Sequence, residues 1–100
     1  MIRKRDRLTT TIERQFLADI IARTKRIEYR RLNSYWTKRL KAVGRPFELR
    51  LINGMIPPMP EVTVLIRRVT VSRKEKEYRL HIKKVLEFKH WDKKRGVPKR

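Results

Sequence analysis

The stretch VTVLIRRVTV, residues 62–71, decides the fold that this sequence predicts. Branched apolar residues alternate with other residues along 62–66 and again along 69–71, which is the period of a strand with one buried face. The two sets are out of phase by one position, so one extra residue is needed if both are to face the same side. We therefore expect a β-bulge at Arg67 or Arg68, as occurs at the corners of β-barrels.

Strand patterns also lie on both sides of this stretch. Residues 47–51 alternate apolar and charged side chains and end at the turn signal 53–54. The proline-rich residues 57–60 cannot supply ladder hydrogen bonds and predict a loop. After a charged turn at 73–77, residues 78–88 predict a final strand.

Two helices and a further strand precede these elements. Thr10 and Glu13 have the spacing of a capping box, and the apolar residues after them recur at helical spacing up to about Arg23. A second helix, capped by the Asn-Ser pair at residues 33–34, is expected to end with Gly44 in the position after its C-cap. Strands this short leave exposed edges unless the sheet closes or is covered.

The order of elements therefore predicts an α+β fold, a small and mostly antiparallel β-barrel with two flanking helices. Between the helices, residues 26–30 have the period of a half-buried strand, and we expect its face with Ile27 and Tyr29 to pack on the core. The chain divides into a basic N-terminal arm at 1–7, a domain at 8–88 and a basic C-terminal tail at 89–100.

The chain is strongly basic. Its 29 Lys and Arg residues and ten Asp and Glu residues give a net charge of +19, of which residues 1–7 carry +3 and residues 89–100 carry +5. The remaining +11 lies on the domain itself. A soluble domain of this size needs a net charge of only about 2–8, so the excess predicts a polyanionic partner. Two alternatives are a charged surface that only aids solubility and an amphipathic helix that lies on a membrane. The membrane helix would need the basic residues on one helix, whereas here they recur on every segment.

Several classes of protein are disfavoured by composition. The chain has no cysteine, so disulfides and thiolate metal sites are excluded, and two histidines alone do not build a metal site. No run of roughly 18 apolar residues predicts a membrane span. We expect a cytoplasmic protein with no metal, no cofactor and no membrane partner.

The densest group of polar side chains lies where the first helix gives way to the first strand. Glu28 and Arg30 share a strand face, and Lys25 comes from the turn just before. Arg30 would bind a phosphate or a base edge, Lys25 would bind a phosphate or act as a base, and Glu28 would accept from an amine or act as an acid or base. The alternative is an exposed ion pair between Glu28 and Arg30, stabilising by well under about 1 kcal/mol.

The segment 16–30 resembles the signature of the ASCH domain, a family of the PUA-like β-barrel superfamily. That signature runs roughly Gly-x-Lys-x-x-Glu-x-Arg after a first helix, and Lys25, Glu28 and Arg30 match it, while Arg23 stands at the glycine. The likeness covers roughly residues 12–88. The resemblance implies a PUA-like fold and RNA binding. Some family members are ribonucleases or amidohydrolases that remove an acyl group from a modified cytidine. In such an enzyme, Lys25 would be the base or nucleophile, assisted by an acid such as Glu61, Glu75 or Glu77.

A second group interleaves aromatic rings with cations, as in proteins on which unpaired bases stack. Trp36 belongs either to this surface or to the core, whereas Trp91 is expected to be exposed, and His81 is interpreted as an ordinary surface histidine. The full set of predicted nucleic-acid-binding residues is Arg23, Lys25, Arg26, Arg30, Arg31, Trp36, Lys38, Arg39, Lys41 and Trp91.

Three functions follow from the sequence. The favoured one is a non-catalytic module that binds nucleic acid, RNA rather than DNA. The second is a hydrolase of RNA or of a modified nucleoside that uses Lys25, Glu28 and Arg30. The third is a basic structural subunit of a ribonucleoprotein or viral particle.

Overall fold

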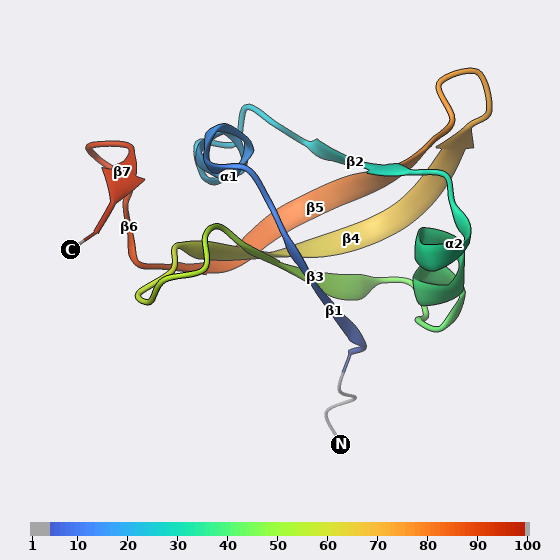
Figure 1. The fold of residues 1–100 in the computed structure, drawn as a ribbon, viewed down its shortest axis with the longest axis horizontal. Helices are drawn as coiled ribbons and strands as arrows, with labels where there is room; N and C mark the ends of the chain where they lie inside the picture. The colour runs from blue at the N-terminus through green and yellow to red at the C-terminus, as the bar shows by residue number, and fades with distance from the viewer. Residues whose placement is uncertain (1–4, 100) are drawn as a thin grey trace.

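The computed structural model describes residues 5–99, which form two helices, one five-stranded sheet and a small two-stranded hairpin (Figure 1). The sheet has the strand order β1-β3-β4-β5-β2, and β6 pairs with β7. In chain order the elements are β1 Arg7–Thr11, α1 Arg14–Ile21, β2 Ile27–Arg31, α2 Ser34–Lys41, β3 Phe47–Ile52, β4 Glu61–Ser72, β5 Glu77–Lys89, β6 Trp91–Asp92 and β7 Val97–Pro98.

The long hairpin of β4 and β5 curves across the whole molecule (Figure 1). Ile66 pairs with Ile82 and Arg68 pairs with His81, so Arg67 has no partner opposite it. The β-bulge predicted at the arginine pair is therefore confirmed. The register also shifts between Thr63 and Val64 and between Leu65 and Ile66, and such irregularities increase the bending and twist of a sheet.

The α+β class with two helices is confirmed, and three of the four strand pairings of the five-stranded sheet are antiparallel as predicted, but the sheet does not close into a barrel. Strand β1 runs parallel to β3, and the sheet is mixed. The edge strands β1 and β2 do not pair with each other, so the curled sheet forms half of a barrel. Strand β1 itself was not predicted, and it contains residues 9–11, three consecutive threonines whose branched side chains favour a strand over a helix.

The predicted capping box is wrong for the same reason. Thr10 lies within β1, and the N-cap of α1 is Glu13, which makes no side-chain capping bond. The second helix begins as predicted, because the Asn33 Oδ1 atom accepts a hydrogen bond from the Trp36 N–H at 2.9 Å. It ends at Lys41 with Ala42 as its C-cap, so Gly44 does not directly follow the cap and instead donates its N–H to Asp6.

Each helix has eight residues, and within residues 5–99 neither is long and apolar enough to cross a membrane. The helices lie toward opposite ends of the sheet (Figure 1). Together with the sheet, α1 covers a core whose most deeply buried side chains are Leu17, Ile20, Ile21, Phe47, Leu49, Leu51, Val62, Val64, Ile66 and Leu80.

Trp91 also belongs to this core. Its side chain is only 5% exposed and packs with the core cluster, although it lies in the segment predicted to be a basic tail. The expectation that Trp91 is exposed is therefore wrong. The β6–β7 hairpin carries the surrounding Lys and Arg side chains on its turn while its tryptophan stays inside.

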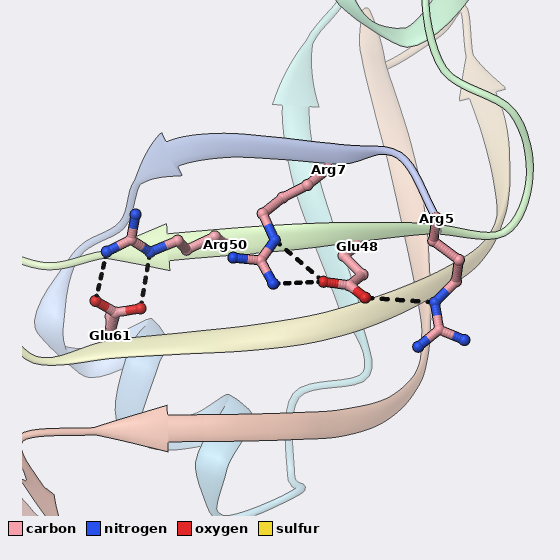
Figure 2. A network of polar contacts seen from close by, with 5 residues as sticks. All are labelled: Arg5, Arg7, Glu48, Arg50 and Glu61. Atoms are coloured by element: carbon pink, nitrogen blue, oxygen red, sulfur yellow. Dashed lines mark hydrogen bonds and ion pairs between the residues drawn. The ribbon is translucent and has the colours of Figure 1, made fainter. Parts of the chain in front are cut away.

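Acidic side chains on β3 and β4 neutralise several arginines (Figure 2). Arg50 donates two hydrogen bonds of 2.8 Å to Glu61, and Arg7 and Arg5 both donate to Glu48. The Arg7 hydrogen bond lowers the pKa of Glu48, and the Arg50 hydrogen bonds lower that of Glu61. Of the basic arm predicted at residues 1–7, the part at 1–4 lies outside the described residues.

Candidate functional site

A pocket of about 660 Å³ opens where the half-barrel remains unclosed, between the end of β1, the start of α1 and strand β2. Lys25, Glu28 and Arg30, which the sequence predicts as a functional group, all line it. The complete lining is Thr11, Ile12, Glu13, Phe16, Lys25, Glu28, Tyr29, Arg30 and Asn53.

Glu28 lies at the centre of this group and is only 4% exposed. One carboxylate oxygen is 3.5 Å from the Lys25 Nζ atom, and the other accepts a hydrogen bond from Arg30 Nη2. Two cations therefore offset the cost of burying one carboxylate, and the exposed Glu28–Arg30 pair considered as an alternative is excluded. The Glu28 carboxylate thus lies between the two cations and contacts both.

The inward face of β2 is the opposite of the one predicted. Glu28 pairs across the sheet with the buried Leu80 and faces inward with it, whereas the Tyr29 side chain is 48% exposed. The expectation that Tyr29 packs on the core is therefore wrong. Its ring instead helps to hold Lys25.

Two exposed aromatic rings flank Lys25. Its Nζ atom lies 5.0 Å from the ring centre of Phe16 and 4.9 Å from that of Tyr29. Both distances are within the range of a cation–π interaction. The pocket thus combines a charged, hydrogen-bonding floor with exposed aromatic rings, which suits a flat and polar guest such as a nucleobase.

Arg30 bridges the gap between the two edge strands. Its Nη2 atom also donates to the Thr11 carbonyl at 2.8 Å, and its guanidinium carbon lies 5.2 Å from the ring centre of Trp36. Arg39 connects α2 to β1, because it donates to the Thr9 carbonyl at 2.8 Å, and it also lies over Trp36. Within residues 5–99, Arg30 Nε is buried without a partner.

The remaining predicted residues lie away from the pocket. Trp36 is buried beneath the two arginines, so it belongs to the core and offers no free stacking face. The other basic candidates occupy the outer surface or neighbouring hollows: Arg23 and Arg26 around the turn before β2, Arg31 at the end of β2, and Lys38 and Lys41 on α2.

None of the carboxylates proposed to assist Lys25 lines the pocket. Glu61 is bound by Arg50, while Glu75 and Glu77 lie at the turn between β4 and β5. Only three of the nine lining residues were predicted as site residues; the six that were not are Thr11, Ile12, Glu13, Phe16, Tyr29 and Asn53. Asn53 donates to the Ile12 carbonyl at 2.9 Å and so fixes the segment that leads into α1.

The turn that presents Lys25 contains a residue with a strained backbone, Arg23. The Arg23 N–H bonds to the Ile20 carbonyl and the Thr24 N–H bonds to the Asp19 carbonyl, which is a Schellman motif. Arg23 has φ +67°, in the left-handed region that glycine favours. Arg23 thus adopts the conformation for which a glycine is suited.

We expect the substitution Arg23→Gly to raise the free energy of unfolding by up to about 1 kcal/mol, since it removes the left-handed strain of a residue with a Cβ. Chemical denaturation of the wild type, Arg23→Gly and Arg23→Ala measures this effect. Arg23→Ala removes the same side chain and keeps the strain. A glycine variant no more stable than the alanine variant would contradict the interpretation.

Within residues 5–99, no group of three or more His, Asp or Glu side chains is placed to hold a metal ion. Comparison of the chain with protein-family models, with curated proteins and with solved structures found no match.

Proposed function

We propose that this protein is an RNA-binding module of the ASCH-like, PUA-like type, which holds one unpaired nucleotide in the pocket. The observation that carries this proposal is the convergence of Lys25, Glu28 and Arg30 in one pocket with two exposed aromatic rings. The net charge of +19 adds a strong attraction for a polyanion.

The chemistry of the pocket supports a base together with its phosphate. A buried carboxylate accepts from an exocyclic amine, the guanidinium donates to ring or phosphate oxygens, and the rings of Phe16 and Tyr29 stack on a base. RNA is favoured because it presents unpaired bases in loops and bulges, whereas the bases of duplex DNA are stacked inside the helix.

Two features support the likeness to ASCH domains. The spacing of Lys25, Glu28 and Arg30 follows the family signature, and the three side chains meet in one place. Arg23, at the position of the family glycine, has a left-handed backbone. A glycine there would suit the same turn.

A hydrolytic function is the second candidate. Lys25 and Glu28 line the pocket 3.5 Å apart, and Glu13 supplies a second carboxylate on the pocket wall, so a lysine and two carboxylates are available there for acid–base chemistry. Incubation with RNA and with an acetylated cytidine distinguishes the two candidates. If the wild type turns over one of these substrates and Lys25→Ala abolishes that turnover, the protein is a hydrolase and not a binding module.

The binding function is tested by removing one ring from the pocket. Tyr29→Ala is expected to weaken binding of a short single-stranded RNA by about 5- to 150-fold, because stacking of a base on an aromatic ring contributes about 1–3 kcal/mol. The dependence of the affinity on salt concentration should stay the same, since no phosphate contact is lost. Fluorescence polarisation measures both quantities.

Phe88→Ala is the matched control, because Phe88 is also an exposed ring on a strand but does not line the pocket. Its affinity should stay within about twofold of the wild type, and thermal unfolding shows whether both variants are folded. Equal losses for Tyr29→Ala and Phe88→Ala would contradict the placement of a base in this pocket.

A further inference from the structure

The pocket continues into two further hollows. A hollow of about 560 Å³ shares Phe16, Lys25 and Tyr29 with the pocket and extends to Arg26 and Ile27. A third hollow, of about 250 Å³, shares Arg26 and Ile27 with the second. Because neighbouring hollows share lining residues, they lie next to one another on the surface. We name the third hollow the bulge groove; its lining is Arg26, Ile27, Arg67, His81, Ile82 and Lys83.

The bulge groove is rich in cations that lack a carboxylate. Arg26, Arg67 and Lys83 are exposed, and among the described residues none of them forms an ion pair. The arginines on β1 and β3 differ, because Glu48 and Glu61 neutralise them (Figure 2). Uncompensated positive charge thus remains at the bulge.

The irregular backbone explains how these side chains come together. Arg67 has no partner in the ladder, and the register steps from Lys84 to Ile82 on β5, so Lys83 is also skipped. A bulge changes the direction of the side chain that it carries. The two register breaks lie next to each other and place Arg67 and Lys83 on the same groove.

His81 lies among these cations. Its Nε2 atom is 2.9 Å from the Thr70 hydroxyl oxygen. The charged groups near it are Arg67 and Arg68 on β4, Arg79 and Lys83 on β5, and Arg26 before β2. All of them are positive. Desolvation, followed by the repulsion of Arg68, Arg67 and Arg79, lowers the pKa of His81, so the imidazole is neutral at pH 7.

We propose that the bulge groove binds the phosphates of the same RNA strand whose base occupies the pocket. The strand would pass over Lys25 and Arg26, which lie where the hollows join. This inference rests on the proposed function and adds the path of the backbone to it. A phosphate beside His81 favours the imidazolium, so binding takes up a proton and strengthens as the pH falls below 7.

A variant that neutralises three groove cations tests the proposal: Arg26→Gln, Arg67→Gln and Lys83→Gln together. Each lost phosphate contact lowers the slope of log affinity against log salt by about 0.7 for a single strand, which is about fivefold in affinity at 0.1 M salt. The triple variant should therefore lose about two units of slope and on the order of 100-fold in affinity for a short single-stranded RNA.

The matched control removes three charges elsewhere: Lys93→Gln, Lys94→Gln and Arg95→Gln on the exposed turn between β6 and β7. The slope of log affinity against log salt for this control should stay within about 0.5 of the wild-type slope, because fewer phosphates are contacted at this turn. If the slope of log affinity against log salt falls equally in the two triple variants, the groove cations act only through the net charge of the protein. The inference is then wrong.

His81→Gln tests the proton uptake, since glutamine keeps a polar group beside Thr70 but does not titrate. The wild type should bind RNA several-fold more tightly at mildly acidic than at neutral pH, and His81→Gln should lose most of this gain. An unchanged pH dependence would overturn this part of the proposal. Failure of the proposed function gives a different result, because Tyr29→Ala would then bind as well as the wild type.

Discussion

Replacing Glu28 by alanine is expected to lower the free energy of unfolding by about 3 kcal/mol. The carboxylate is the shared partner of Lys25 and Arg30, whose side chains are only 14% and 17% exposed. Without it, two largely buried cations lie side by side with no counter-charge. Arg30 also bridges to the Thr11 carbonyl, so repulsion in this group would loosen the contact between the two edge strands. Urea denaturation measures the loss.

Glu77→Ala provides the control for this substitution. Glu77 also forms an ion pair on a strand, with Arg79, but that pair is more accessible to water, since its side chains are 24% and 40% exposed. Its loss should therefore cost less than about 1 kcal/mol, although the change in net charge is the same. Glu28→Gln, which keeps the shape and a hydrogen-bond acceptor, should lie between the two. Equal effects of Glu28→Ala and Glu77→Ala would contradict the central structural role of Glu28.

The β4–β5 hairpin could be predicted because the sequence pattern that determines it lies within a few neighbouring residues. The phase change between residues 66 and 69 by itself requires an extra residue, and the register break lies at Arg67. The capping of α2 by Asn33 is also local, because donor and acceptor are three residues apart. Patterns of this kind can be interpreted without knowing the rest of the fold.

Strand β1 could not be predicted in the same way. Thr10 and Glu13 match a capping box, and only the pairing of β1 with β3 decides against it. That partner lies about 40 residues further along the chain, at Glu48–Ile52. A long-range pairing overrode a short-range helix signal, and the sheet is mixed as a consequence.

The inward face of β2 was mispredicted for a related reason. An apolar and a charged face alternate on this strand, and burying the apolar face is the usual outcome. Here Lys25 and Arg30 neutralise Glu28, which makes the charged face suitable for burial beside Leu80. Trp91 shows the same limit, because its basic neighbours predict exposure while the fold places the ring in the core.

The three central side chains of the site were predictable because they lie within six residues of each other. The remaining walls come from distant segments: Phe16 from α1 and Asn53 from the end of β3. Phe16 belongs to the apolar pattern of its helix and gave no separate signal. The bulge groove also needed the fold, since Arg26 and Arg67 meet only through the sheet.

The most direct test of the central claim is the affinity of the intact protein for single-stranded RNA as a function of salt. If the pocket and the groove together contact about 6–10 phosphates, the affinity for a single strand should fall by roughly 300- to 16,000-fold between about 50 and 200 mM salt. Polarisation of a labelled RNA gives this slope. The account predicts tight binding at the lower concentration and a steep, linear decrease on logarithmic axes. Absence of binding at about 50 mM salt, or an affinity that does not change with salt, would contradict it.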